Sequence, residues 1–163
     1  FAPVSRHTTL RMLLSLCTAP EWTAHHVDVH TAFLHGEVEE ELYATQPPAY
    51  VEGENLVCRL HKALYGLRQA PRQWYTKLIA TLQDLGFQPS NADPSLYILR
   101  EGPHLVYLLV YVDDCLFIGR DSPLLHTAKA LLTSAFPSRD LGVVTQFLGM
   151  VVLLAPGSVS VDF

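Results

Sequence analysis

Short apolar runs bounded by polar or turn-forming residues predict several strands in the middle and at the end of the chain. Between residues 94 and 120, the segment "PSLYILREGPHLVYLLVYVDDCLFIGR" contains three apolar runs. Glu101-Gly102-Pro103 separates the first two, and a pair of aspartates separates the last two. Such interruptions are typical of hairpin turns, so this segment predicts three consecutive antiparallel strands. Further strands are expected at 23–29, 55–60 and 143–154, and 158–163 predicts the start of one more.

A helical period of apolar residues is clearest in "APRQWYTKLIATLQDLGF" (70–87), where they recur every three or four positions. Pro71 suits the first turn of this helix, and Gly86 suits its end. The segments 5–16 and 121–136 also predict helices, the second with Asp121 or Ser122 as its N-cap. This order of elements predicts an α+β domain in which helices pack on an antiparallel sheet.

The composition is that of one folded domain spanning residues 1–163, because 49% of the residues are hydrophobic and 17% are charged. The net charge of −5 does not indicate nucleic-acid binding, so such binding needs a local basic patch. Three cysteines without regular spacing give no disulfide framework and indicate a reducing compartment. No apolar run approaches the roughly 20 residues of a membrane helix, so no membrane partner is expected.

Two adjacent aspartates, Asp113 and Asp114, interrupt the apolar segment "LLVYVDDCLFIG" (108–119). A buried and unpaired carboxylate costs several kcal/mol, and two like charges close together cost more. Consecutive strand residues point to opposite faces, so we place the pair at a hairpin turn, with Asp113 as the main functional group and Asp114 as its support. A purely polar hairpin turn also explains the pair, and both interpretations stay open.

Asp28, in "HHVDVHTAFLHG", ends a short β-like segment and is the best candidate for a further carboxylate at the same place. Several carboxylates that converge from separate strands need a counter-charge. Mg²⁺ prefers such oxygen ligands, and a pair of ions about 4 Å apart serves in-line phosphoryl transfer. The alternative for Asp28 is a solvated cap at the strand end.

A local basic stretch without any acidic residue extends from residue 55 to residue 83. It contains "ALYGLRQAPRQWY" (63–75), in which Gly66 permits a close approach of the backbone. Its basic residues are Arg59, Lys62, Arg68, Arg72 and Lys77, and its aromatic residues include Tyr65, Trp74 and Tyr75. This mixture suits contacts to a phosphate backbone and base stacking. A solvated basic helix face is the alternative.

Together these segments resemble the reverse transcriptase of copia-type LTR retrotransposons, over about residues 1–152. The resemblance is carried, in the family's order, by "DVHTAFLHGEVEEELY", "CRLHKALYGLRQAPRQWYTKL", "ADPSLYI", "LLVYVDD" and "DLG…FLGM". It implies a right-hand polymerase palm, with a ferredoxin-like antiparallel sheet and helices on one face, plus part of the fingers. It also implies RNA- and DNA-templated DNA synthesis.

The resemblance implies a role for each matching residue. Asp28, Asp113 and Asp114 match the catalytic and metal-binding aspartates, and Val29 matches a backbone contact to the two Mg²⁺ ions, for which Mn²⁺ can substitute. The residues implied to line the nucleotide are Phe33, Tyr65, Gly66 and Arg139. Phe33 matches an aromatic steric gate that would collide with a ribose 2′-OH, although a core aromatic is the alternative. Arg139 could assist the pyrophosphate, or be a plain surface arginine.

The implied nucleic-acid contacts are Arg68, Pro71, Arg72, Tyr111, Phe147, Leu148 and Gly149. The last three match the loop that grips the primer 3′ end, whereas their sequence alone predicts strand core. The implied partners are an RNA or DNA template with its primer, deoxynucleoside triphosphates, and the integrase and RNase H of the same polyprotein. The implied location is a cytoplasmic virus-like particle, or the nucleus.

Other sites are weaker candidates. His26 and His30 do not come together on a strand, so a zinc site is not favoured, and Cys58 with His61 forms only a half-site. Because Phe1-Ala2-Pro3 matches a mid-domain position, we expect a fragment that lacks the finger strands and polymerises poorly alone. A non-catalytic remnant that binds nucleic acid is an alternative. Another two-metal palm enzyme, such as a nucleotide cyclase, is a third hypothesis, against which the segment 63–75 counts.

Overall fold

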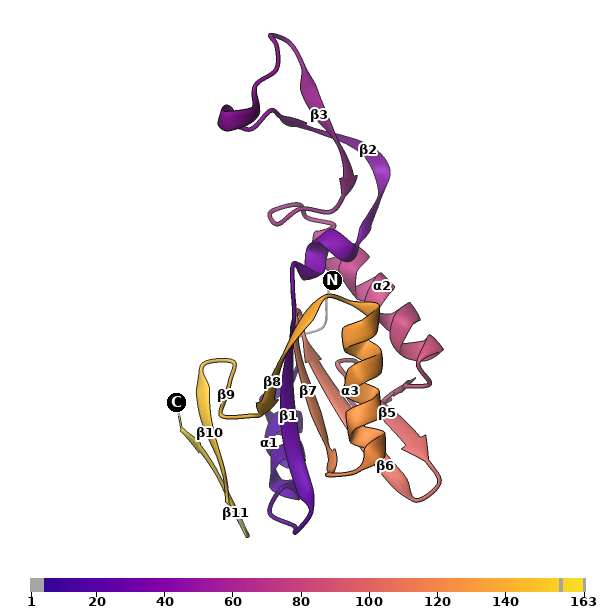
Figure 1. The fold of residues 1–163 in the computed structure, drawn as a ribbon, viewed down its shortest axis with the longest axis vertical. Helices are drawn as coiled ribbons and strands as arrows, with labels where there is room; N and C mark the ends of the chain where they lie inside the picture. The colour runs from indigo at the N-terminus through magenta and orange to yellow at the C-terminus, as the bar shows by residue number, and fades with distance from the viewer. Residues whose placement is uncertain (1–4, 156, 163) are drawn as a thin grey trace.

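The computed structural model describes residues 5–155 and 157–162 (Figure 1). The described residues form the helices α1 (His7–Leu16), α2 (Ala70–Asp84) and α3 (Pro123–Ala135), and the 3-10 turns η1 (Ala32–His35) and η2 (Pro48–Tyr50). The strands are β1 (Trp22–Val29), β2 (Glu37–Thr45), β3 (Val57–Lys62), β4 (Gln88–Pro89), β5 (Leu96–Glu101), β6 (His104–Tyr111), β7 (Asp114–Arg120), β8 (Ser138–Val143), β9 (Gln146–Phe147), β10 (Met150–Ala155) and β11 (Ser158–Asp162). The expected mid-domain start at Phe1-Ala2-Pro3 and the last residue of the predicted strand 158–163 lie outside the described residues.

The main sheet has six strands in the order β4-β5-β6-β7-β1-β8, and its neighbouring strands pair antiparallel. The chain passes through β1, α2, β6, β7, α3 and β8, so two helical connections alternate with central strands. The predicted α+β class and the three strands within 94–120 are confirmed. The N-cap of α3 is Ser122, one of the two predicted caps, whose Oγ accepts the Leu125 N–H at 3.5 Å.

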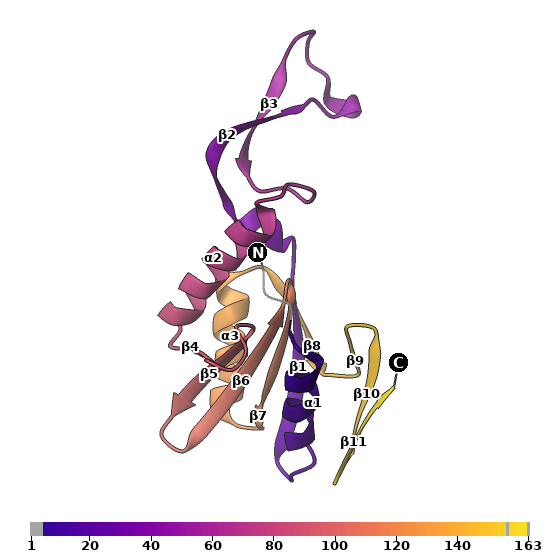
Figure 2. The same ribbon diagram turned by 180° about the vertical axis from the view of Figure 1, so that it is seen from behind.

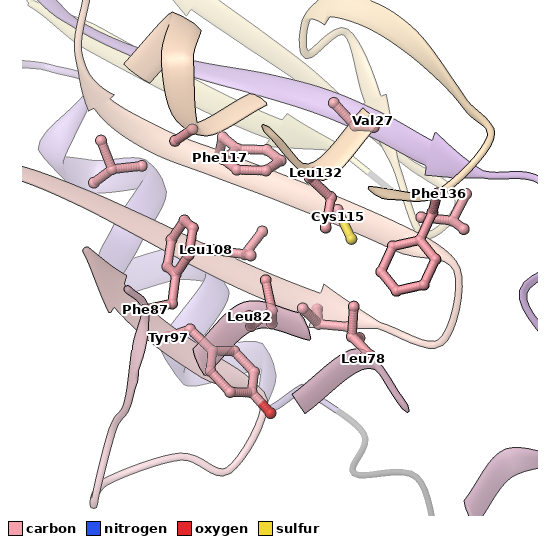
Figure 3. Close-up of a cluster of buried hydrophobic side chains, with 14 of the residues drawn as sticks. Val27, Leu78, Leu82, Phe87, Tyr97, Leu108, Cys115, Phe117, Leu132 and Phe136 are labelled. Atoms are coloured by element: carbon pink, nitrogen blue, oxygen red, sulfur yellow. The ribbon is translucent and has the colours of Figure 1, made fainter. Parts of the chain in front are cut away.

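Two hydrophobic clusters cover the two faces of the main sheet. The first lies between the sheet and the helices α2 and α3, and is built from large buried side chains such as Leu78, Leu82 and Phe117 (Figure 3). The second lies on the opposite face, where Leu13 of α1 packs with Phe147 and Val152 of the small sheet β11-β10-β9. The expectation of helices on one face therefore holds for α2 and α3 but is wrong for α1, whose apolar stripe needs its own sheet surface.

The C-terminal strands differ from the prediction of one strand over 143–154. The apolar segment is divided by a turn at Leu148 and Gly149, whose φ values are 50° and 81°, and this turn joins β9 to β10. Positive φ at both central residues is the geometry of a tight hairpin. The strand β8 was not predicted, because its mostly exposed residues show no apolar alternation.

The hairpin of β2 and β3 extends as an arm beyond one end of the main sheet, as both views show (Figure 2). The predicted acidic stretch 36–43 forms most of β2, and 55–60 falls largely within β3. Gly36 begins the arm against α2, where a Cβ atom would lie only 2.8 Å from the Gln73 Cβ. The absence of a side chain at Gly36 therefore allows the arm to leave the sheet at this point.

Candidate active site

Four residues predicted for the site lie in one row across four strands of the main sheet. Asp28 of β1 is paired with Asp114 of β7 on one side and with Arg139 of β8 on the other. Asp114 is in turn paired with Tyr111 of β6. Residues directly opposite on antiparallel strands place their side chains on the same face, with Cβ atoms about 5 Å apart. The row therefore brings Asp28 and Asp114 together at the end of the sheet from which the arm leaves.

The turn between β6 and β7 consists of Val112 and Asp113, and it is strained. Val112 has a φ of 58°, which is unfavourable for a β-branched residue. Two donors from other elements hold the turn: the Trp74 Nε1–H of α2 donates to the Val112 carbonyl at 2.7 Å, and the Val29 N–H of β1 donates to the Asp113 carbonyl at 2.9 Å. The turn that carries Asp113 is thus fixed to both β1 and α2.

Burial and neighbouring charges raise the pKa values of two groups at this end of the sheet. Burial raises the pKa of Asp113 above its ordinary value, and the charges of Asp114 and Asp28 raise it further. Burial also raises the pKa of Tyr65, with further contributions from Asp113 and Asp28. The Tyr65 ring lies 4.4 Å from the ring of Phe33, measured between centroids. The structure therefore gathers these three aspartates beside the aromatic pair Phe33 and Tyr65.

Asp114 has a partner that the sequence did not reveal. The Nε2 atom of His26 lies 2.6 Å from the Asp114 Oδ1, and the His26 ring packs edge-on against Phe147 at 5.3 Å. His26 precedes Asp28 by two positions, so strand alternation alone places both on one face. The spacing of two residues between His26 and Asp28 was the signal that could have placed His26 at the site. The weak zinc hypothesis paired His26 with His30 instead.

The donor chemistry fits a hard divalent cation. Asp28 and Asp113 offer carboxylate oxygens, and mutual repulsion between such groups is relieved by Mg²⁺. Within residues 5–155 and 157–162, no three side chains of His, Cys, Asp or Glu are arranged around a common metal position. The contact with His26 uses the Oδ1 atom of Asp114, and a carboxylate has two oxygens, so this contact does not exclude Asp114 as a ligand.

A cavity of about 440 Å³ lies next to Asp114 and His26 and is otherwise lined by residues of 141–149. The turn predicted to grip the primer therefore lines the same cavity as Asp114. Phe147 itself is only 1% exposed and belongs to the second hydrophobic cluster. Of this turn, Gly149 is exposed and Leu148 is half-buried, so these two residues border the open space.

The basic stretch divides into exposed and structural residues. Arg68 and Arg72 are exposed, Pro71 lies in the first turn of α2 as predicted, and Gly66 has a φ of 97°. Tyr65, at 57% exposure, is available for stacking.

The prediction of base stacking is wrong for Trp74, and Tyr75 is half-buried. Trp74 is 1% exposed and supports the Val112 turn. The Tyr75 hydroxyl donates to the Pro94 carbonyl at 2.9 Å. Trp74 is buried because it lies on the apolar face of α2, which packs against the sheet.

The chain matches a known protein family over nearly its whole length. The family described as "Reverse transcriptase (RNA-dependent DNA polymerase)" matches residues 1–162. The chain belongs to the reverse transcriptase family. This membership confirms the resemblance that the sequence motifs predicted.

Relatives of this reverse transcriptase domain are retrotransposon proteins. The chain is 41% identical over 152 residues to the Retrovirus-related Pol polyprotein from transposon RE1 of Arabidopsis thaliana, covering 92% of the chain and 10% of that protein. It is 41% identical over 156 residues to the corresponding polyprotein from transposon TNT 1-94 of Nicotiana tabacum, covering 94% and 12%. A putative transposon Ty5-1 protein of Saccharomyces cerevisiae is 36% identical over 126 residues, covering 76% and 41%. The chain thus spans about a tenth of the two plant polyproteins.

Proposed function

We propose that this chain is the palm and part of the fingers of a copia-type reverse transcriptase, an RNA-directed DNA polymerase that adds deoxynucleotides to a primer 3′-OH. The observation that carries the proposal is the convergence of Asp28, Asp113 and Asp114 at one end of the sheet, in a chain of this family. The strand–helix–strand–strand–helix–strand order through the main sheet supports a ferredoxin-like palm.

Asp28 and Asp113, with the backbone of Val29, would hold two Mg²⁺ ions, and Mn²⁺ could replace them. When bound, such ions lower the pKa of the attacking hydroxyl and offset charge on the triphosphate. Asp114 supports this site from the neighbouring strand, where His26 orients its carboxylate. The Val112 turn keeps Asp113 in place, because Trp74 and Val29 restrain its backbone.

The surrounding residues would position the substrates. Phe33 and Tyr65 form an aromatic wall beside the carboxylates, and Phe33 would exclude a ribose 2′-OH. Arg139, in the same row as Asp28, would bind the leaving pyrophosphate. Leu148 and Gly149 would contact the primer end next to Asp114, while Phe147 supports them from the core.

The partners proposed for the site are an RNA or DNA template with its primer, and deoxynucleoside triphosphates. Tyr65, Gly66, Tyr111, Arg68, Pro71 and Arg72 would contribute to these contacts. The remainder of the polyprotein, with integrase and RNase H, is proposed as the physical context, in a cytoplasmic particle or the nucleus. The relatives named Pol polyproteins support this context. In the described part of the chain, no helix has the length and apolarity to cross a bilayer.

Primer extension tests the proposal. In a chimera, residues 1–162 replace the matching segment of the tobacco transposon polyprotein, and extension of a DNA primer on an RNA template is measured. Asp113→Asn should reduce the rate roughly 100-fold or more, because a carboxylate proposed to hold the Mg²⁺ ions is lost, and with it their stabilisation of the transferring phosphoryl group. The control Asp121→Asn changes an exposed aspartate paired with His126 and should leave the rate unchanged.

Full extension by the Asp113→Asn chimera would refute the assigned role. An unmutated chimera that binds primer–template but never extends it would favour the non-catalytic remnant. We also propose that the 163 residues alone extend a primer weakly, and robust synthesis by this chain would contradict that part.

A further inference from the structure

The loop at the far end of the arm contains the tetrapeptide Pro-Pro-Ala-Tyr, residues 47–50, which the proposed polymerase function does not use. It follows β2 directly and includes η2, so it lies at the end of the arm remote from the main sheet (Figure 1). All four residues are exposed, and Tyr50 reaches 76% exposure. Val51, which follows, is 62% exposed. Large apolar side chains grouped in this way on a surface indicate an interaction site.

The backbone of this tetrapeptide is extended at Pro47 and then turns, because Pro48–Tyr50 form the 3-10 turn η2. Pro47 has φ −60° and ψ 141°, which is the polyproline II conformation. The Tyr50 N–H then donates to the Pro47 carbonyl at 2.8 Å, so the chain turns immediately after the prolines. Both positions 47 and 50 are exposed on this turn. A proline ring and a tyrosine ring are therefore accessible to solvent within one short turn.

One side chain organises the loop that presents the tetrapeptide. Gln46 Nε2 donates to the carbonyls of Gly53 at 3.0 Å and Leu56 at 3.1 Å, and Gln46 Oε1 accepts the Glu52 N–H at 2.9 Å. These three hydrogen bonds join both ends of the loop across the arm. A loop ordered before binding loses less conformational entropy in a complex, which strengthens the complex.

We propose that residues 47–50 are a ligand for a proline-recognition domain of the WW type. Such domains hold a polyproline II segment in a groove lined by aromatic side chains, and Pro-Pro-x-Tyr is a sequence that this geometry accommodates. The exposed Tyr50 contributes a large ring and a hydroxyl group. An SH3 domain needs a second proline at position 50, where this chain has tyrosine. Glu52 and Glu54 beside the tetrapeptide favour a domain with basic residues at the rim of its groove.

Titration calorimetry of the 163-residue chain with a purified WW domain of the Pro-Pro-x-Tyr-binding class tests this proposal. Saturable one-to-one binding is expected, and Tyr50→Ala and Pro48→Ala should each weaken it at least about tenfold. Tyr43→Ala is the matched control, because Tyr43 is 54% exposed on β2 of the same arm but lies outside the tetrapeptide. Its affinity should stay within about twofold of the unchanged chain.

The variant Gln46→Ala tests the organised loop separately. It should weaken binding several-fold without abolishing it, because the tetrapeptide is retained but no longer held. Absence of WW-domain binding, or unchanged binding by Tyr50→Ala, would overturn the proposal. Binding of an SH3 domain in place of the WW domain, or of an SH2 domain only after phosphorylation of Tyr50, would also overturn it. These outcomes are independent of primer extension.

Discussion

The β6–β7 connection, which carries Asp113, and the β2–β3 connection, which carries residues 47–50, are built in opposite ways. The β6–β7 connection has only Val112 and Asp113, and donors from α2 and β1 hold it from two sides. The β2–β3 connection is a long loop that a single side chain of the arm, Gln46, organises. The first turn is half-buried and strained, whereas the second presents its central residues to solvent.

This difference matches the tasks proposed for the two connections. A carboxylate that takes part in phosphoryl transfer must keep its position within about 0.5 Å, so its turn needs support from rigid elements. A peptide that docks into another protein needs exposure, and its loop can tolerate larger motions. The predictions that follow run from the largest expected effect to the smallest, and they test this contrast and, in one case, the sheet that carries Asp28.

Trp74→Phe should lower the free energy of unfolding by about 2 kcal/mol, because the Val112 carbonyl loses its donor while most of the ring packing stays. Urea denaturation measures this change. Trp22→Phe is the control, since Trp22 is half-buried and stacks on Tyr107 at 6.2 Å. Equal stability of the Trp74→Phe variant and the unchanged chain would show that the turn does not depend on α2.

Val112→Asn should raise the free energy of unfolding by about 1 kcal/mol, because asparagine tolerates the positive φ that strains a β-branched residue. Val57→Asn is the matched control in the arm, where the exposed β3 residue has ordinary strand geometry. No gain is expected there. If Val57→Asn raised the free energy of unfolding and Val112→Asn left it unchanged, the β6–β7 turn would not be the strained position.

Acid should weaken the main sheet through His25, which is buried with its Nδ1 2.7 Å from the Lys129 Nζ. Burial, and then the Lys129 charge, lower the pKa of His25 below 6.5, so the folded state favours the neutral ring. The other groups that act on it are Asp140, His126 and Asp121. The unfolded chain binds the proton more readily, so stability is full above pH 6.5 and falls as the pH drops below it.

Thermal unfolding between about pH 7.5 and pH 5.5 measures this effect, since free histidines titrate within that range. The midpoint temperature should fall in the unchanged chain and fall less in His25→Gln, which keeps an acceptor for Lys129. His104→Gln, at an exposed position of β6, should behave like the unchanged chain. An identical slope in His25→Gln would exclude His25 as the cause.

Gln46→Ala should change the free energy of unfolding by less than about 0.5 kcal/mol, because the arm loop contributes little to the core. Hydrogen exchange of the amides in 47–56 should nevertheless accelerate, and proteolytic cleavage there should increase. Protection of the β6–β7 turn should stay unchanged. Global destabilisation by this variant would show that the arm loop and the main sheet unfold together.

Much of the main sheet could be predicted, because its central strands are short apolar runs and its turns contain glycine, proline or adjacent aspartates. The helices were predictable because their apolar residues repeat at helical spacing. The edge strand β8 could not be found, because its residues are largely exposed and lack alternation. The turn at Leu148 was hidden inside an apolar run that strand patterning alone would continue.

For the site, the motifs located Asp28, Asp113 and Asp114, and the structure brought them together. The register that aligns Asp28 with Arg139 depends on an irregularity between β1 and β8, which no local pattern encodes. The contact between Trp74 and the Val112 turn joins residues 38 positions apart. Such long-range contacts depend on tertiary packing, and this explains why a buried structural tryptophan was predicted to stack on bases.

The row of Tyr111, Asp114, Asp28 and Arg139 has a consequence for synthesis on the ribosome. Asp28 of β1 emerges first, but Arg139 belongs to β8, so the row is completed only after residue 139 has left the exit tunnel. A nascent chain that stops before this point has β1 without its outer neighbour. Ribosome pausing or premature termination upstream of β8 should therefore release aggregation-prone chains with an unpaired β1 edge.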